Sequence, residues 1–166
     1  LIPVLASMEK EGINLDSPAL NTYSDELQEE IIKIRDRIYE HAGFEFNIAS
    51  PKQLGEVLFE RLKVTDKPKL TKTKQYSTSE DVLQKLQKKH PIIQEILDFR
   101  SLTKLKSTYV DSLPQLVNAK DNRIHTSYMQ TVAATGRLSS QNPNLQNIPI
   151  RTDKGREIRK AFIPRD

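Results

Sequence analysis

Apolar residues recur every three or four positions along much of the first 113 residues, which is the spacing of one buried face of a helix. The longest such seam starts at Ser17-Pro18 and stops at Ala42-Gly43, so it predicts one helix of about 25 residues. A seam this long and intermittent is more typical of a helix packed against an antiparallel partner than of a parallel coiled coil. Its apolar positions are Leu20, Tyr23, Leu27, Ile31, Ile34 and Ile38.

Shorter helices are predicted on either side of the long one. The first ends at Gly12, a residue suited to a left-handed C-terminal cap. Another begins at Ser50-Pro51-Lys52-Gln53, a capping box with proline in the first turn, and Pro91 opens a further helix. We expect side-chain caps from Ser17, Ser50 and the serines of residues 77–79, because serine oxygens accept hydrogen bonds from first-turn amides.

The remaining segments predict loops, one strand and a last short helix. Residues 63–76 hold five lysines with almost no apolar periodicity, which indicates a mobile basic loop. Residues 123–132 alternate apolar and polar side chains, as a half-buried strand does, after a turn at 118–122. Residues 135–149 are rich in Gly, Ser, Asn, Gln and Pro and predict an irregular loop, and residues 155–161 predict a helix. The predicted fold class is mainly α, and α+β overall.

Charge is distributed unevenly along the chain. The formal net charge of +4 combines −6 over residues 1–62 with +10 over residues 63–166. Within the basic part, residues 63–122 and residues 123–166 each carry +5. Such an asymmetry favours a polyanionic partner, with nucleic acid ahead of an anionic membrane, and a solvated charged surface is the simpler alternative.

Composition excludes several classes of site. The chain has no cysteine, so disulfides, thiolate zinc sites and cysteine nucleophiles are excluded. No run of about 18 or more apolar residues occurs, so we expect no transmembrane helix and no membrane partner. No signal peptide is visible, and the start at Leu1 lacks both a basic segment and a methionine, which suggests a piece of a longer, cytoplasmic protein.

The residue types also argue against catalysis within this chain. Catalysis by two metal ions needs converging carboxylates, yet residues 123–166 offer only Asp153, Glu157 and Asp166, none of them in an apolar strand. The three histidines are isolated, and no phosphate loop, nucleotide-binding glycine fingerprint or GxSxG elbow is present. We therefore expect no catalytic residue and no metal site here.

Three places in the first 113 residues carry groups that can bind DNA phosphates through hydroxyls, amides and point charges, without reading the base sequence. The alternative is that Ser50 and Ser77 only cap helices. Capping is expected in either case, and phosphate contact would be an added role. The three places are Asn47 with Ser50, Lys72 and Lys74 with residues 77–79, and Arg100 with Lys104.

A second set of candidates lies between Thr135 and Arg151. Arg137, Gln146 and Asn147 carry donors that can meet the purine N3 and pyrimidine O2 acceptors of the minor groove, which are nearly the same for every base pair. A protein that handles every sequence but senses pair geometry would use such contacts. Ordinary turn chemistry is the alternative for these residue types.

Several strings of residues in this chain resemble motifs of the bacterial family A DNA polymerases, the polymerase I type. The most specific match is Thr135-Gly136-Arg137-Leu138-Ser139-Ser140 with Pro143-Asn144-Leu145-Gln146-Asn147-Ile148-Pro149, which resembles the motif at the start of that family's palm. Other strings agree in order over essentially the whole chain. They are Met8-Glu9 to Gly12-Ile13, Phe46-Asn47 with Ser50-Pro51-Lys52-Gln53-Leu54, Ser77-Thr78-Ser79-Glu80, Leu102-Thr103-Lys104-Leu105-Lys106-Ser107-Thr108-Tyr109, and His125-Thr126-Ser127-Tyr128.

The resemblance implies three parts. Residues 1–15 would be a helix leading into the palm, residues 16–113 a thumb built from an antiparallel pair of long helices with a small helical tip, and residues 114–166 a proximal palm segment with a few strands. Residues matching the family's backbone contacts are Asn47, Ser50, Lys72, Ser77, Ser79, Arg100 and Lys104. Those matching its minor-groove and primer-end contacts are Arg137, Asn144, Gln146, Asn147 and Arg151.

Two residues depart from the family's pattern at the thumb tip. Lys74 stands where the family usually has glycine, which puts the loop geometry in question while adding a cation. Ala49 replaces a frequent polar residue and removes one possible contact.

The resemblance places the family's catalytic carboxylates and nucleotide-binding helix beyond residue 166. The parent protein would then perform template-directed nucleotidyl transfer in DNA replication and repair, as a monomer on primer-template duplex DNA, with Mg²⁺ and dNTP bound outside this chain. Two other classes stay open: a stand-alone nonspecific duplex DNA-binding module without catalysis, and a helical scaffold that binds protein.

Overall fold

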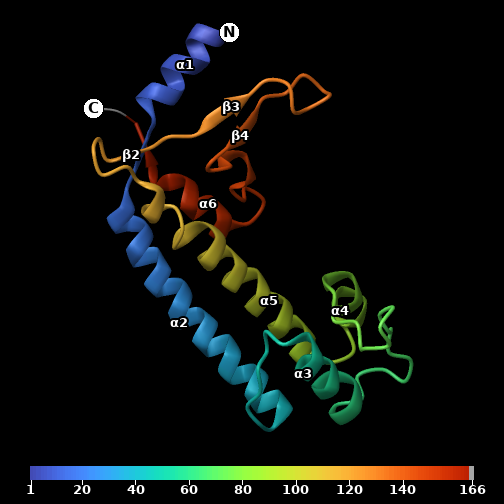
Figure 1. The fold of residues 1–166 in the computed structure, drawn as a ribbon. Helices are drawn as coiled ribbons and strands as arrows, with labels where there is room; N and C mark the ends of the chain where they lie inside the picture. The colour runs from blue at the N-terminus through green and yellow to red at the C-terminus, as the bar shows by residue number, and fades with distance from the viewer. Residues whose placement is uncertain (165–166) are drawn as a thin grey trace. The chain divides into compact units, whose positions relative to one another are not determined.

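The structure is a computed structural model and describes residues 1–164, which form helices joined by short strands and turns (Figure 1). The helices are α1 (Ile2–Glu11), α2 (Ser17–Ala42), α3 (Pro51–Glu56), α4 (Glu80–Leu86), α5 (Pro91–Leu105) and α6 (Asp153–Lys160). The π-helical turns η1 (Val57–Arg61) and η2 (Lys106–Val110) continue α3 and α5, and η3 (Pro114–Leu116) and η4 (Leu145–Asn147) are single 3₁₀ turns. The strands are β1 (Ile13–Leu15), β2 (Arg123–Ile124), β3 (Ser127–Met129), β4 (Ser139–Gln141) and β5 (Phe162–Ile163).

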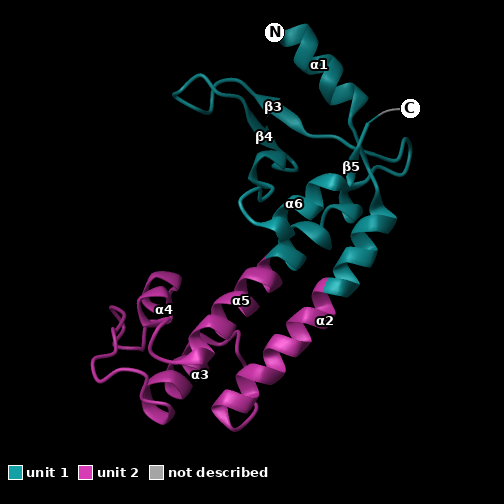
Figure 2. Ribbon diagram, turned by 180° about the vertical axis from the view of Figure 1, so that it is seen from behind, with its two compact units in different colours: residues 1–26, 105–166 teal, residues 27–104 magenta. Residues whose placement is uncertain are grey.

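Two antiparallel sheets contain these strands, one with the order β2-β1-β5 and one formed by β3 and β4. The prediction of a mainly α fold with a few strands is confirmed. The chain divides into two compact units (Figure 2). Unit 1 joins residues 1–26 to the residues from 105 on, and unit 2 is residues 27–104. The subdomain limits inferred from the resemblance, at residues 15 and 113, stay a prediction.

Within unit 2, α2 and α5 run antiparallel, as expected for the long seam. Arg37 of α2 forms an ion pair with Glu95 of α5 at 2.8 Å, and farther along α2 the ring of His41 meets that of His90 edge-on, with centroids 5.8 Å apart. Increasing residue numbers on one helix thus meet decreasing numbers on the other. The buried seam contributes roughly 1.5–3 kcal/mol per large apolar side chain. It consists of Leu27, Ile31, Ile34, Ile38, Ile92, Ile93, Ile96 and Leu102.

The helix starts use the predicted residue types only in part. Ser50 Oγ accepts a hydrogen bond from Gln53 N at 3.4 Å, as predicted, and Gln53 Oε1 accepts one from Asn47 N at 2.8 Å. At α2 the prediction was wrong, because Asp16 Oδ1 accepts from Ala19 N at 3.0 Å and makes the cap in place of Ser17.

The predicted side-chain cap at the start of α4 was also wrong. The Ser79 side chain makes no capping hydrogen bond with any described residue, and its Oγ accepts a hydrogen bond from the Ser77 hydroxyl at 3.4 Å. At the start of α5, His90 Nδ1 accepts from Ile92 N at 3.2 Å. A histidine cap therefore opens α5 beside Pro91.

The basic segment 63–76 contains a short hairpin where the sequence predicted a mobile basic loop. Leu70 bridges to Tyr76, and Ser77 N donates to Lys69 O at 2.8 Å. Lys74 occupies the tip at φ +58°, a left-handed conformation that favours glycine and costs other residues about 1–2 kcal/mol. The lysine at this position therefore keeps the backbone conformation that a glycine would adopt.

Tyr76 fastens this hairpin to α3 and η1. Its ring centroid lies 5.2 Å from that of Phe59, and its Cβ would be only 2.7 Å from a Cβ added to Gly55. Burial, and then the neighbouring Glu60 carboxylate, raise the pKa of the Tyr76 hydroxyl. Gly55 is thus the residue that lets the hairpin approach the helix.

Unit 1 is organised around β1. Ile13 pairs with Ile124 of β2, and Leu15 pairs with Phe162 of β5. Gly12 ends α1 at φ +71° and ψ −171°, and its N–H donates to Met8 O, so the chain passes directly into β1. Tyr23 of α2 donates a hydrogen bond to Lys154 O at 2.9 Å, which joins α2 to α6.

The prediction of one strand over residues 123–132 was wrong. β2 pairs with β1, β3 pairs with β4, and His125 and Thr126 separate the two strands. The alternation misled because Thr126 is a polar residue buried through hydrogen bonds. The segment 135–149 likewise contains β4, which the sequence did not predict, whereas the turn at 118–122 and the helix α6 were predicted.

Candidate nucleic-acid interface

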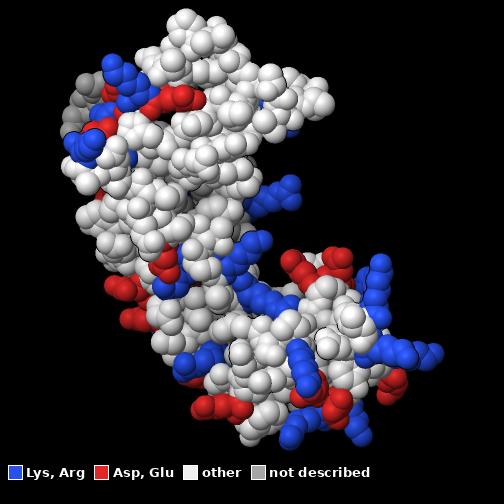
Figure 3. Space-filling view, viewed as in Figure 1, with Lys and Arg blue, Asp and Glu red and all other residues white. Residues whose placement is uncertain are grey.

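In unit 2, the predicted phosphate-contact residues lie at the start of α3, along the hairpin of residues 69–77, at the start of α4 and on α5. Asn47 is exposed, and its Oδ1 accepts from Ala49 N at 3.0 Å, so the asparagine shapes the turn that precedes α3. Lys72 and Lys74 are exposed on the hairpin. Figure 3 shows basic side chains projecting from the segment between η1 and α4, with acidic side chains close by.

Arg100 differs from the other candidates because its guanidinium is committed to the protein. Nη1 donates to Thr78 O, and Nη2 lies 3.3 Å from Thr78 Oγ1. Thr78 is only 6% exposed, and burial lowers the pKa of Arg100. Lys104, one helical turn further along α5, is exposed. Arg100 therefore fixes the segment between Ser77 and Ser79 to α5, whatever else it contacts.

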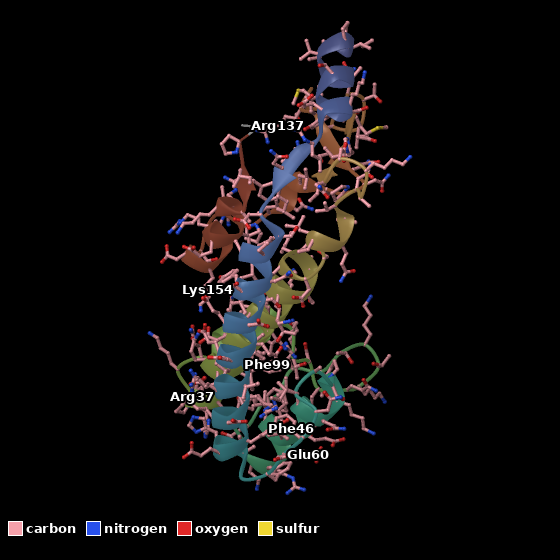
Figure 4. All side chains as sticks on the ribbon, turned by 90° about the vertical axis from the view of Figure 1, so that its left-hand side faces the viewer. Arg37, Phe46, Glu60, Phe99, Arg137 and Lys154 are labelled. Atoms are coloured by element: carbon pink, nitrogen blue, oxygen red, sulfur yellow. The ribbon has the colours of Figure 1, made fainter. Side chains whose placement is uncertain are left out.

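In unit 1, the predicted minor-groove residues lie on the segment that contains β4 and η4. Arg137 is exposed on the loop before β4, next to Gly136 at φ +74°, and Figure 4 labels it there. Asn144 Oδ1 accepts from Gln146 N at 3.0 Å and starts η4. Gln146 Nε2 donates to Leu138 O at 2.8 Å, so this side chain ties η4 to the residue before β4.

Asn147 and Arg151 complete this group, and both are exposed. Tyr109 of η2 donates a hydrogen bond from its hydroxyl to Asn147 O at 2.7 Å. The structure thus brings Asn144, Gln146 and Asn147 together on one 3₁₀ turn and links that turn to the strand that follows Arg137. Tyr109 ends the string that runs from Leu102, but no sequence signal showed that its hydroxyl supports η4.

Two of the four basic side chains of α6 form ion pairs within the helix. Arg156 pairs with Asp153, and Lys160 Nζ lies 2.6 Å from Glu157 Oε1. Thr152 Oγ1 caps the helix by accepting from Gly155 N at 3.1 Å. A Cβ at Gly155 would lie 2.7 Å from Pro149 Cβ, so the close approach of α6 to Pro149 depends on glycine.

Among residues 1–164 no group of three or more His, Asp or Glu side chains is placed to hold a metal ion, and none of the helices there is long and apolar enough to cross a membrane. Asp166 lies outside the described residues. A cleft of about 540 Å³ is lined by Gly12, Asn14, Arg123 and Tyr128 among others, but Arg123 is already ion-paired with Glu11 at 2.6 Å.

The ring of His125 lies between two hydrogen-bond acceptors. Its Nδ1 lies 2.7 Å from Glu9 O and its Nε2 lies 2.8 Å from Asp121 Oδ2, so both ring nitrogens face acceptors. The hydrogen bond to Glu9 O, and then the one to Asp121, raise the pKa of His125. Because the folded state favours the imidazolium, its contribution is complete below the unfolded pKa of about 6.5 and is lost as pH rises through the higher folded value.

We therefore expect the free energy of unfolding of unit 1 to fall as pH rises above about 6.5, in the protein that carries this chain. Denaturation measured from pH 6 to 9 checks this, and His125→Gln should remove that part of the slope. A nuclear magnetic resonance titration of His125 with its midpoint at or below 6.5 would contradict the assignment.

Comparison with known proteins decides the family. A model of DNA polymerase family A matches residues 17–166. The chain belongs to DNA polymerase family A. It is 56% identical over 162 residues to DNA polymerase I of Synechocystis sp., covering 97% of this chain and 16% of that protein. It is 50% identical to DNA polymerase I of Geobacillus stearothermophilus, covering 99% of this chain and 18% of that protein.

Among solved structures, the chain resembles the POL domain of Pol1 from M. smegmatis in complex with DNA primer-template and dNTP. The TM-score is 0.82 at 48% identity, over 96% of this chain and 28% of that one. The resemblance inferred from the motifs is thus confirmed. This family A chain spans less than a fifth of the length of the curated relatives named above.

Proposed function

We propose that the protein carrying this chain is a DNA-directed DNA polymerase, and that the chain supplies part of its grip on primer-template duplex DNA. The main support is the segment of residues 144–151, which contains η4 and exposes Asn147 and Arg151. A solved relative of this chain is in complex with primer-template DNA. The hairpin of residues 69–77 adds exposed Lys72 and Lys74. The two basic regions would bind different parts of the duplex: phosphates at the hairpin, and the minor groove near the primer end at η4.

The proposal carries the subdomain assignment with it. Residues 16–113 would be a thumb, residues 114–166 the proximal palm, and residues 1–15 the helix that leads into the palm. The Mg²⁺ and dNTP of the transfer reaction would be held elsewhere in the parent protein, where the resemblance places the family's catalytic carboxylates and nucleotide-binding helix. We further propose that the parent acts as a monomer in the cytoplasm, in DNA replication and repair.

The direct test is binding of a primer-template duplex by the full-length protein over a range of salt concentrations. The logarithm of the affinity should fall with the logarithm of salt concentration by about 0.9 for each phosphate neutralised. Lys72→Ala should lower that slope by about 1 and shorten the dwell time on any sequence. Lys33→Ala, which removes an exposed lysine of α2 outside the candidate set, is the matched control and should change neither quantity.

Arg137→Ala should act differently, because a minor-groove donor senses pair geometry. We expect primer extension to weaken by a factor of about 5 to 150, the equivalent of 1–3 kcal/mol, and more from mismatched primer ends than from matched ones. Identical defects for Arg137→Ala and Lys72→Ala would refute the division of roles. Binding that does not depend on salt would refute the DNA interface itself, and binding without nucleotide incorporation would favour the stand-alone module.

A further inference from the structure

We propose that Thr126 and Ser140 are positioning residues whose buried hydroxyl pair sets the conformation of η4, and through it the placement of Asn144, Gln146 and Asn147 on DNA. This inference rests on the proposed function. Neither residue would touch the duplex, since Thr126 is 5% and Ser140 is 1% exposed. The string His125-Thr126-Ser127-Tyr128 stood out in the sequence, but the DNA-contact residues leave Thr126 without a role.

The two hydroxyls gather the backbone of the turn that joins β4 to η4. Thr126 Oγ1 lies 2.6 Å from Ser140 Oγ, 3.0 Å from Gln141 O and 2.8 Å from Pro143 O. Ser140 Oγ lies 3.1 Å from Pro143 O and accepts a hydrogen bond from Leu145 N at 3.2 Å. One consistent arrangement is a relay in which Leu145 N–H donates to Ser140, Ser140 donates to Thr126, and Thr126 donates to Pro143 O.

This relay fixes the backbone conformation of the turn, as apolar packing does elsewhere in the chain. Between residues 139 and 147 the only large apolar side chain is Leu145, which is half-buried. Buried hydroxyls and carbonyls lose water on folding, so each must find a protein partner, and a fully partnered network defines one backbone conformation. Thr126 lies just before β3, and Ser140 is the central residue of β4, opposite Tyr128. The relay therefore holds the turn at one end of the β3–β4 pair.

The conformation of that turn reaches the proposed contacts directly. Asn144, the residue that caps η4, follows Pro143, whose carbonyl the relay holds. Gln146 is anchored to Leu138 O, and Asn147 O to Tyr109. The exposed side chains of η4 thus extend from a turn whose inner side is fixed by hydrogen bonds, and loss of the relay would let the turn relax on that side.

The experiment uses the full-length protein and two substitutions at one position. Thr126→Val keeps the shape of the side chain but removes its hydroxyl, whereas Thr126→Ser keeps the hydroxyl. We expect Thr126→Val to weaken binding of primer-template and raise its KM about tenfold, with kcat for single-nucleotide incorporation reduced less. Thr126→Ser should stay within about twofold of the parent. The salt slope should not change for either variant, because no phosphate contact is removed.

A double-mutant cycle separates positioning from general damage. A triple variant, Asn144→Ala with Gln146→Ala and Asn147→Ala, removes the side chains that Thr126 would place. Adding Thr126→Val to that triple variant should cause little further loss in DNA affinity, because the two changes act through the same contacts. A merely structural defect would add to the loss in full.

The outcomes distinguish this inference from the proposed function. If the triple variant binds primer-template normally, the minor-groove contact is absent and both ideas fall. If the triple variant is defective but Thr126→Val is normal, or Thr126→Ser is as defective as Thr126→Val, only the positioning role is overturned. Should Thr126→Val fail to fold, Ser140→Ala removes the middle link of the relay and is judged in the same two comparisons.

Discussion

Replacing Gly12 with alanine should destabilise unit 1 by about 2–6 kcal/mol, the largest effect we expect from adding a single methyl group in this unit. Gly12 lies at φ +71° and ψ −171°, a backbone region that is essentially restricted to glycine and costs other residues about 1–3 kcal/mol. A Cβ there would also lie 2.8 Å from His125 Cε1 and 3.1 Å from Arg123 Cβ. Overpacking of this kind costs about 1–3 kcal/mol more.

Gly43 supplies the matched control for the clash. It too has a positive φ, of +80°, but a Cβ there would meet no atom within 4 Å. Gly43→Ala should therefore cost only the conformational term, about 1–2 kcal/mol. Denaturation of the protein that carries this chain measures both variants, together with hydrogen exchange of the β1 and β2 amides for Gly12→Ala and of the last-turn amides of α2 for Gly43→Ala. Equal losses in the two variants would show that the packing of His125 against Gly12 contributes nothing.

The helices could be predicted from the sequence because their burial is periodic. Leu27, Ile31, Ile34 and Ile38 are all buried, and they recur at the spacing that one face of α2 requires. The cap of α2 could not be predicted with the same accuracy. Asp16 and Ser17 are both good capping residues, and the choice between them depends on which oxygen reaches Ala19 N in the folded chain.

The strands were harder because their pairing depends on residues distant in sequence. Ser139, Ser140 and Gln141 show no apolar alternation, and they form β4 because β3 and the Thr126 hydroxyl lie beside them. The alternation from Arg123 onward continues through His125 and Thr126, although the chain changes sheets there. The pattern of apolar and polar residues indicates which apolar side chains are buried. It does not indicate that Thr126, a polar residue, is buried by its hydrogen bonds.

The candidate interface could likewise be predicted from the sequence only in part. The sequence indicated which residue types could meet DNA, and the structure leaves Lys72, Lys74, Arg137 and Arg151 exposed. It could not indicate that Arg100 would donate hydrogen bonds to a residue 22 positions earlier. A contact of that kind depends on how α5 packs beside the start of α4, which no local pattern records.

Substitution of Arg100 should show that it is a structural anchor of residues 77–79. Arg100→Ala leaves the buried Thr78 carbonyl and hydroxyl without their partner, which costs about 1–3 kcal/mol of local stability. We expect faster hydrogen exchange in α4. We also expect a loss of affinity for primer-template DNA, because Ser77 and Ser79 would no longer be held in place for their own contacts with DNA. Lys104→Ala, one turn away on an exposed position of α5, should lower the salt slope by about 1 without changing exchange in α4.

Arg100→Lys separates the anchor from a direct phosphate contact. A lysine keeps the positive charge but cannot place two donors in the fixed fork that meets both Thr78 oxygens. If Arg100 served only as a point charge, the lysine variant would bind DNA like the parent and keep its salt slope. The geometry predicts instead that Arg100→Lys loses nearly as much affinity as Arg100→Ala. It also predicts that Thr78→Val, which removes only Oγ1, is less than additive with either variant, because the residues share one interaction. Full additivity would assign the effect of Arg100 to the DNA phosphates.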